Sequence, residues 1–496
     1  MRNQVQLITY VDRLAGGGMR ALHGLLNSKL EGLFGGVHLL PFFYPIDGSD
    51  AGFDPIDHTQ VDPRLGDWRG VQEIGSDYDL VADLIVNHVS SQSPQFADYS
   101  ENGSASPYAG LFLSFDRVFP RGATEKDLLT IYRPRPGFPC TTYTLGTGEK
   151  QMLWTTFTPQ QLDIDVYHPQ GKAYLSAILE RFQAAGVRLI RLDAVGYAIK
   201  KAGTSCFMIP ETFSFIAELT REARGLGIDV LVEIHSYYLH QIEIAKRVDR
   251  VYDFALPPLV LHSLFSGDAT ALTQWLKISP RNAITVLDTH DGIGVIDVGR
   301  SPQGEPGLLK PEAIDRLVET IHERSGGQSR QATGAAASNL DLYQVNCTYY
   351  DALGRRDVEY LIARAVQFFA PGIPQVYYTG LLAGENDMEL LAKSKVGRDI
   401  NRHYYTAEEI DKNLARPVVK ALAWLMKFRN QHQAFEGELE VANPSASQIV
   451  LTWSDGADSA RLAVDFAGPK AMLAWTGENG DQVVDVDLEL GKRIDY

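Results

Sequence analysis

The chain has 496 residues, enough to bury a large core without disulfides, and its length suggests roughly three domains. Its net charge of −16 argues against nucleic acid as a partner, and three widely spaced cysteines argue against a disulfide framework or a zinc cluster. No run of 18 apolar residues occurs and no secretory apolar segment precedes the first strand-like run, so we expect a cytoplasmic protein with no membrane segment.

Eight short apolar runs are candidate β-strands, at 5–11, 36–43, 80–89, 186–195, 228–235, 250–257, 283–291 and 373–378. Helix periodicity lies between several of them, at 171–185, 211–225, 259–276, 311–323 and 356–370. Near-continuous apolar strands that alternate with helices indicate a parallel sheet covered on both faces. Eight such units predict an α/β fold of the (β/α)8 TIM barrel type. The alternative is a doubly wound sheet, but no glycine-rich phosphate fingerprint follows the first strand.

Two long insertions interrupt this alternation of strands and helices, and the sequence pattern changes again near the carboxyl terminus. Both insertions leave from the carboxyl ends of strands, where barrel enzymes keep their active sites. After residue 436, short strands separated by Gly, Asp and Asn predict a small antiparallel β domain. The predicted division is therefore a barrel in three parts, two insertion domains and a β domain: 1–86, 167–291 and 356–435; 87–166 and 292–355; and 436–496.

Charged side chains gather at the predicted strand ends. In "RLIRLDAVGY", strand alternation puts Arg191 and Asp193 on the same face as Leu189. Other strand ends carry His88, Glu233, His235, Asp288, His290 and Asp291. Any one of these could be a buried ion pair that ties strands together. The whole set is harder to explain that way, because desolvating several charges is costly unless they have a function.

Carboxylates from separate strands suit glycosyl transfer. Asp193 can attack an anomeric carbon, Glu233 can protonate the leaving oxygen, and Arg191 can keep the attacking carboxylate ionised. The rival interpretation is a metal-dependent barrel hydrolase that uses His88, His235 and His290. Such barrels usually carry His-x-His on the first strand, and "VQLITYVD" has no histidine, so we expect no metal.

Four motifs in order, "DLIVNH", "RLIRLDAVGY", "LVEIH" and "VLDTHD", resemble those of the α-amylase superfamily of retaining glycosidases and transglycosylases. Longer stretches are similar to the sucrose phosphorylase family over essentially the full chain. They include "LPFFYPIDGSDAGFDPIDH", "IYRPRPGFP", "RLDAVGYAIKKAGTSCFM", "AASNLDLYQVN" and "GRDINRHYY".

This resemblance implies roles for individual residues. Asp193 would be the nucleophile, Glu233 the general acid/base and Asp291 the group that stabilises the transition state. The glucose side would comprise Asp50, Phe53, His88, Arg191, His290 and Arg398, with Phe157 packing near the reacting centre. The acceptor side, where fructose leaves and phosphate enters, would comprise Pro134, Arg135, Gln161, Tyr197, His235, Asp341, Leu342, Tyr343 and Gln344.

Two loops on the acceptor side carry physical signals of their own. In "YRPRPG", Arg133 and Arg135 lie on a loop stiffened by prolines, and they could attract phosphate or simply form surface salt bridges. "DLYQ" lies in the second insertion with small-residue flanks. It could contact fructose and phosphate in turn by moving.

The implied activity is the reversible phosphorolysis of sucrose by inorganic phosphate to α-D-glucose 1-phosphate and fructose, through a covalent β-glucosyl-enzyme. The resemblance implies no cofactor and a homodimer. The alternatives are a phosphorylase of sucrose 6′-phosphate, glucosylglycerol or glucosylglycerate, and an α-glucosidase or transglucosidase. A catalytically silent carbohydrate-binding subunit is a further alternative, but such proteins usually lack one of the three carboxylates, which are all present here.

Overall fold

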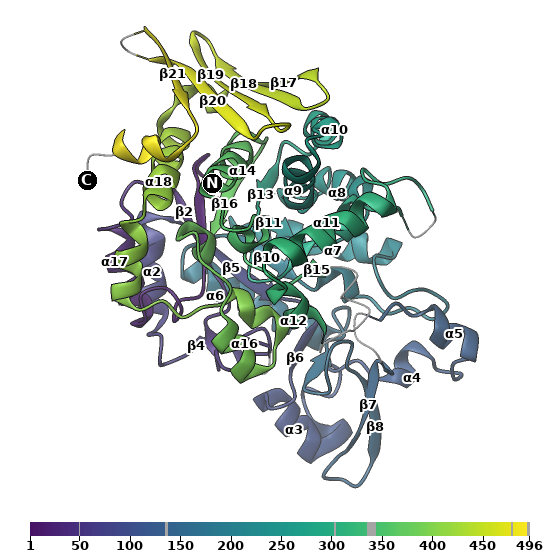
Figure 1. The fold of residues 1–496 in the computed structure, drawn as a ribbon. Helices are drawn as coiled ribbons and strands as arrows, with labels where there is room; N and C mark the ends of the chain where they lie inside the picture. Colours follow the sequence, from purple (N-terminus) through teal and green to yellow (C-terminus); the bar gives the residue numbers. More distant parts are fainter. Residues whose placement is uncertain (49, 134–136, 302–303, 335–343, 478–479, 494–496) are drawn as a thin grey trace.

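The computed structural model describes residues 1–48, 50–133, 137–301, 304–334, 344–477 and 480–493 (Figure 1). Eight parallel strands close into a barrel in the order β1-β16-β13-β12-β11-β10-β5-β2. They are β1 (Gln6–Thr9), β2 (Gly36–Leu39), β5 (Asp79–Ile85), β10 (Val187–Asp193), β11 (Asp229–Val232), β12 (Arg250–Asp253), β13 (Ala283–Thr285) and β16 (Ile373–Tyr377). Seven lie within one of the eight predicted runs and β5 begins one residue before its run, and the predicted α/β barrel is confirmed.

The barrel interior is apolar in its lower part and charged at its carboxyl end. Leu189 of β10 belongs to a fully buried cluster inside the barrel, together with Val81, Leu231 and Ile284. The register pairs Arg191 with Leu231 on one side and with Asp83 on the other. Because side chains alternate along a strand, Arg191 lies one layer above Leu189 in the same interior.

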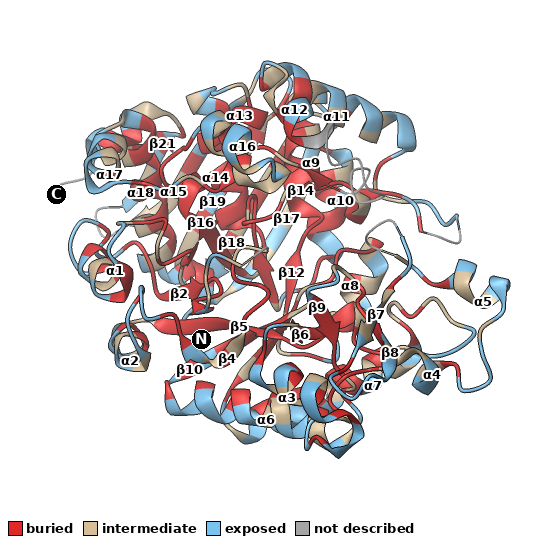
Figure 2. Cartoon of the chain, turned by 90° about the horizontal axis from the view of Figure 1, so that it is seen from below, coloured by how far each residue is buried: buried red, intermediate tan, exposed pale blue. Residues whose placement is uncertain are grey.

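Helices surround the barrel, with their exposed faces turned outward and the buried strands at the centre (Figure 2). Those that follow the predicted periodicity are α6 (Pro169–Ala184), α7 (Pro210–Gly225), α11 (Pro311–Arg324) and α14 (Asp357–Phe369). Others are α1 (Gly18–Leu26), α2 (Trp68–Asp77), α8 (Tyr238–Ala245), α15 (Tyr378–Leu381), α16 (Met388–Ser394), α17 (Ala407–Leu414) and α18 (Pro417–Gln431). None of the described helices is long and apolar enough to cross a membrane.

The pattern over 259–276 predicts one helix, but the structure has two, α9 (Leu256–Ser266) and α10 (Thr270–Ile278). Gly267 separates them at φ 75°, and its N–H donates to the carbonyl of Ser263 at 2.9 Å. Glycine adopts this left-handed conformation without a steric penalty, so it ends the first helix. The predicted strand at 250–257 is correspondingly shorter, because α9 begins at Leu256.

The described residues of 87–166, the first predicted insertion, contain two antiparallel strand pairs and three short α-helices. Strand β6 (His88–Ser90) pairs with β9 (Gln161–Asp163), and β7 (Cys140–Thr144) pairs with β8 (Lys150–Trp154). The helices are α3 (Pro94–Asn102), α4 (Phe115–Val118) and α5 (Glu125–Thr130). In Figure 1 this segment projects from the barrel on the side away from the C-terminal sheet. His88, predicted at a barrel strand end, opens β6, because β5 already ends at Ile85.

The second predicted insertion, 292–355, adds β14 (Ile293–Gly294) and β15 (Gln344–Val345), which pair antiparallel, as well as α11, α12 (Gln328–Gly334) and α13 (Tyr349–Ala352). The bounds of both insertions remain predictions.

The C-terminal antiparallel domain is confirmed as a sheet of β17 (Glu438–Ser445), β18 (Gln448–Asp455), β19 (Asp458–Asp465), β20 (Lys470–Gly477) and β21 (Gly480–Asp485). The indole of Trp453 ties it to the barrel by donating to the carbonyl of Phe369 at 2.9 Å.

We expect Gly372→Ala to lower the free energy of unfolding by about 2 kcal/mol or more. Gly372 precedes β16 at φ 118°, and a Cβ there would lie 2.3 Å from the carbonyl oxygen of Ala283. The matched control is Gly24→Ala in the exposed middle of α1, where a Cβ meets nothing within 4 Å. This control should be neutral or stabilising by about 0.5–1 kcal/mol. Equal melting temperatures for the two variants would contradict the close approach of these strands.

Candidate active site

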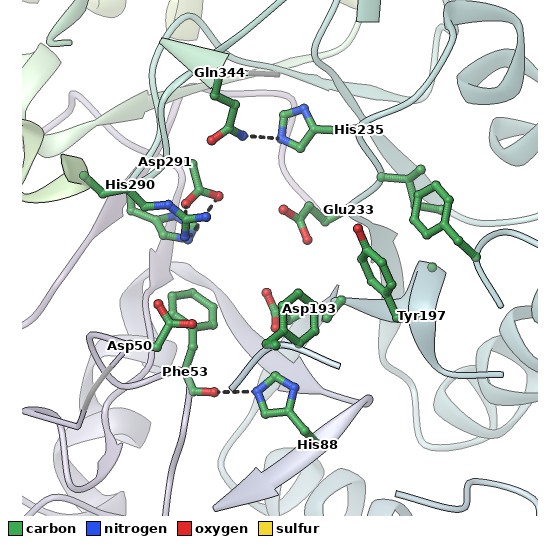
Figure 3. A pocket seen from close by; sticks show the side chains of 16 residues that line it. Asp50, Phe53, His88, Asp193, Tyr197, Glu233, His235, His290, Asp291 and Gln344 are labelled. Atoms are coloured by element: carbon green, nitrogen blue, oxygen red, sulfur yellow. Dashed lines mark hydrogen bonds and ion pairs between the residues drawn. The ribbon is translucent and has the colours of Figure 1, made fainter. Parts of the chain in front are cut away.

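A cavity opens at the carboxyl ends of the barrel strands, and most of the predicted site residues line it (Figure 3). Asp193 ends β10, Glu233 follows β11 and Asp291 follows β13. Figure 3 shows their three carboxylates facing one common space. The other predicted residues that line the cavity are Asp50, Phe53, His88, Phe157, Tyr197, His235, His290, Gln344 and Arg398.

Arg191 lies beneath the cavity and joins its carboxylates. Its side chain is 2% exposed, and its Nη1 contacts Asp193 Oδ1 at 3.0 Å while its Nη2 contacts Glu233 Oε1 at 3.0 Å. Nη1 also reaches Asp83 Oδ1 at 2.5 Å. A planar guanidinium presents several donors in a fixed fork, so one side chain fixes the orientation of three carboxylates at once.

Asp83 of β5 is a functional residue that the sequence analysis missed. It is completely buried and contacts His38 Nε2 at 3.1 Å in addition to Arg191. Burial raises its pKa, but Arg191 and His38 outweigh that effect and lower the pKa to about 2. Asp83 is therefore a permanent anion beneath the site. The signal lay in the motif "DLIVNH", where the leading aspartate interrupts an apolar strand.

Burial raises the pKa of Asp193, Arg191 opposes that shift, and the nearby charge of Glu233 adds to it, so the net shift is upward. Directly after Asp193, Ala194 has φ 54°, a left-handed conformation that is uncommon outside glycine. The chain therefore turns sharply where β10 ends and leaves Asp193 at the rim of the barrel. Backbone strain of this kind is often concentrated at functional sites.

The pKa of Asp291 is shifted in the opposite direction to that of Asp193. Its Oδ1 contacts Arg398 Nη1 at 2.8 Å and Arg402 Nη2 at 3.9 Å. Burial raises its pKa, but Arg398, His290 and Arg402 outweigh it and hold the pKa well below the usual range. Arg402 was also missed. It is 1% exposed, and its Nε donates to the carbonyl of His290 at 2.9 Å.

The predicted glucose-side residues form a tight wall next to these charges. The ring of Phe53 stacks on His290 with centroids 4.9 Å apart and planes at 11°, and the Arg191 guanidinium lies 5.5 Å from the Phe53 centroid. His88 Nε2 donates to the carbonyl of Phe53 at 2.9 Å. Burial lowers the pKa of His290 to about 3 and also lowers that of His88, so both rings are neutral at pH 7. Gln161 is fully buried behind His88, 3.1 Å from its Nε2.

Aromatic rings form the opposite wall, on the predicted acceptor side. Tyr197 lies edge to face with Phe157 at 5.1 Å and contacts Phe207 at 4.7 Å. Phe207 in turn stacks on Tyr132 at 4.7 Å. Phe207 lines the cavity and was not predicted, although it lies within the quoted stretch "RLDAVGYAIKKAGTSCFM".

His235 and Gln344 complete this wall. His235 Nδ1 contacts Asp297 Oδ2 at 3.0 Å, and Gln344 Nε2 lies 3.2 Å from His235 Nε2. Burial lowers the pKa of His235, but Asp297, Glu233 and Asp291 together outweigh burial, so the net shift is upward. This imidazole therefore carries positive charge more readily than His88 or His290.

Some predicted site residues do not line the cavity, and others are not described by the structure. Pro134, Arg135, Asp341, Leu342 and Tyr343 lie outside the described residues, so their roles remain predictions. Asp288 is directed away from this set, in a buried ion pair with Arg364 at 2.6 Å, and does not line the cavity. Within the described part of the chain, no group of three His, Cys, Asp or Glu side chains is arranged to hold a metal ion.

Comparison with known proteins gives the family. No family model matches the chain. The sucrose phosphorylase of Agrobacterium vitis is 65% identical over 477 residues, covering 96% of this chain and 98% of that protein. The sucrose phosphorylase of Bifidobacterium adolescentis is 53% identical over 491 residues, covering 97% of each chain.

Among solved structures, sucrose 6F-phosphate phosphorylase from Thermoanaerobacter thermosaccharolyticum superposes with a TM-score of 0.90 at 37% identity. The match covers 98% of this chain and 97% of that chain. With a parallel barrel, strand-end carboxylates and relatives of this similarity over nearly the full length, the chain belongs to the sucrose phosphorylase family.

Proposed function

We propose that this protein is a sucrose phosphorylase, which transfers the glucosyl group of sucrose to inorganic phosphate. The observation that carries the proposal is the bridging of Asp193 and Glu233 by a single buried guanidinium, that of Arg191. Retaining glycosyl transfer needs two carboxyl groups about 5–5.5 Å apart, and a shared guanidinium is compatible with that spacing. Family membership at 65% identity supports the choice of substrates.

In the first step, a carboxylate oxygen of Asp193 attacks the anomeric carbon of the glucosyl group. The bond from that carbon to the fructosyl oxygen breaks, and Glu233 gives its proton to this oxygen, so fructose leaves neutral. The product is a β-glucosyl ester on Asp193. Asp291, which Arg398 holds ionised, faces the same cavity and stabilises the positive charge that develops on the sugar ring.

In the second step, a phosphate oxygen attacks the same carbon and the Asp193 carboxylate leaves. Glu233, now deprotonated, can accept the proton of the attacking phosphate hydroxyl. Two inversions give net retention and release α-D-glucose 1-phosphate. The raised pKa of His235 favours its positively charged form on the acceptor side, and Arg135 is proposed to supply further positive charge to phosphate.

Two further properties complete the proposal. Three free cysteines, two of them buried, suit a reducing compartment such as the cytoplasm. A homodimer is proposed from the family alone.

The identity of the donor is tested by incubating the protein with sucrose, sucrose 6′-phosphate, glucosylglycerol or glucosylglycerate, each with and without phosphate. The proposal is supported if, of the four donors, only sucrose gives α-D-glucose 1-phosphate, and only when phosphate is present. Preferential use of another donor would assign the chain to a related phosphorylase, and phosphate-independent release of glucose would indicate an α-glucosidase.

Asp193→Asn should reduce turnover of sucrose by at least about 10⁴-fold, because the amide cannot form the glucosyl ester. The matched control is Asp411→Asn. It makes the same change in an exposed carboxylate of α17, which is paired with Lys29. Initial rates and melting curves of both variants check the prediction. Near-normal turnover in a folded Asp193→Asn protein would remove Asp193 as the nucleophile.

Glu233→Gln should reduce turnover of sucrose by about 10²–10⁴-fold but reduce turnover of α-D-glucosyl fluoride far less. Fluoride leaves without protonation, and phosphate is already an anionic nucleophile. The measurement compares fructose release with fluoride release for the same variant at saturating phosphate. Equal losses with both donors would contradict the role of Glu233 as the general acid.

The rate should fall on the acidic side at a higher pH than an ordinary aspartate would cause. Only ionised Asp193 can attack, and its pKa is raised, so the active form is lost as the pH falls through that raised value. The acidic limb of kcat/KM for sucrose should therefore lie above about 3.9, the usual value for aspartate. Full activity retained down to about pH 4 would show that Asp193 is not shifted upward.

A further inference from the structure

A second cavity of about 410 Å³ lies on the flank of the barrel and shares no lining residue with the active site. Its walls come from the first residues of β4 (Asp57–Val61), from α3, from residues 107–111 and from one face of α6. Figure 2 shows α3, α6 and β4 close together along one edge of the molecule. Its size falls in the range of about 300–1,000 Å³ that is typical of sites for small molecules.

Helix α6 presents two different faces. Leu175, Ile178, Leu179 and Phe182 are buried in the core. The cavity is instead lined by Gln170, Ala173, Tyr174 and Ala177, which follow the i, i+3, i+4, i+7 spacing of a single helix face. The two alanines leave space that larger side chains would fill, and Tyr174 adds an aromatic ring beside it. Across the cavity lies Tyr108, 38% exposed.

His58 supplies the first unsatisfied acceptor at this cavity. It is 1% exposed, and its Nε2 lies 3.2 Å from the carbonyl oxygen of Asp83. A carbonyl can only accept, so Nε2 carries the hydrogen, and Nδ1 of the neutral ring holds a lone pair. Burial lowers the pKa of His58 to about 4, which keeps the ring neutral at pH 7. This buried Nδ1 has no hydrogen-bond partner within the described part of the chain.

Gln95 of α3 supplies the second unsatisfied acceptor. Its Oε1 is buried and, among the residues described, has no donor. A buried acceptor left unsatisfied costs about 1–3 kcal/mol, so two of them around one cavity need an explanation. Asp57, which already accepts from Thr59 at 2.7 Å, makes the cavity wall still richer in acceptors. The cavity therefore calls for hydrogen-bond donors and disfavours anions such as phosphate.

We propose that this cavity is a second binding site, for a small neutral polyol or monosaccharide. Both acceptor atoms are almost fully covered, so binding requires the neighbouring side chains to move. The ligand's hydroxyl groups then donate to His58 Nδ1 and Gln95 Oε1, and its apolar face packs on the rings of Tyr108 and Tyr174. Ordered water could satisfy the two acceptors, but it would leave the aromatic rings and most of the cavity volume without a specific partner. The proposed site is separate from the active site, because the two cavities share no lining residue. His58 connects it to Asp83, which in turn contacts Arg191.

The test uses D-fructose as the probe and the full chain as the protein. Equilibrium dialysis with radiolabelled fructose should give two binding sites per wild-type chain. Ala177→Leu fills the cavity from an exposed helix position and should weaken one of the two sites at least about tenfold. The matched control is Ala184→Leu, at an exposed position of the same helix outside the cavity, and it should retain both sites. Sucrose turnover should be unchanged in both variants.

A crystal soaked in fructose locates the ligand directly and gives a second measurement. Density for the sugar within hydrogen-bond distance of His58 Nδ1 and Gln95 Oε1 is the expected result. Water alone at these atoms, or dialysis data that Ala177→Leu does not change, would overturn the proposal. The proposal would also be overturned if the cavity bound tetramethylammonium and not fructose, and if Ala177→Leu abolished that binding. Such a result would make the cavity a cation site. Gln95→Leu removes an unsatisfied acceptor and should weaken fructose binding without lowering the melting temperature.

Discussion

The active site depends on one buried cation. Arg191 is shielded from water, and it is compensated by Asp83 below and by Asp193 and Glu233 above. Burying a guanidinium is expensive unless its donors are all satisfied by acceptors of opposite charge. Here the compensation comes from three neighbouring strands, so the geometry of the barrel and the geometry of the proposed catalytic carboxylates are fixed by the same contacts. Losing one partner would leave an uncompensated charge and disturb the other two.

Carboxylates outnumber cations around Arg191, and this imbalance has a chemical consequence. Burial and like charge raise the pKa of Asp193, while arginines lower that of Asp291. Neighbouring groups whose pKa values are pushed apart can take different roles in one reaction. Excess negative charge is unfavourable by itself, and in the proposed reaction it becomes favourable when positive charge develops on a glucosyl ring. For the proposed reaction, the site is thus more complementary to the transition state than to the ground state.

The sequence was most informative where chemistry and strand alternation coincide. Arg191 and Asp193 lie two residues apart on an apolar strand, so a shared interior face could be inferred without the structure. Asp83 could not be identified in the same way, because its partner is more than a hundred residues away and only strand register brings them together. Phe207 was missed for a related reason: its place in the cavity depends on aromatic packing with Tyr197, which leaves no periodic signal. Local conformation caused the remaining errors, as at Gly267, where a left-handed glycine ends a helix inside a continuous amphipathic pattern.

The two sides of the cavity are formed by different parts of the fold. Groups on the predicted glucose side follow barrel strands and are held by ion pairs such as that of the buried Asp291 with the partly buried Arg398. On the acceptor side, Gln344 belongs to β15 of the second insertion and reaches the site through His235, which Asp297 orients. A change in the insertion can therefore alter the acceptor contacts while the Arg191 cluster stays intact. This division explains physically how one family can keep a single glucosyl-transfer chemistry and vary the molecule that receives or releases the glucosyl group.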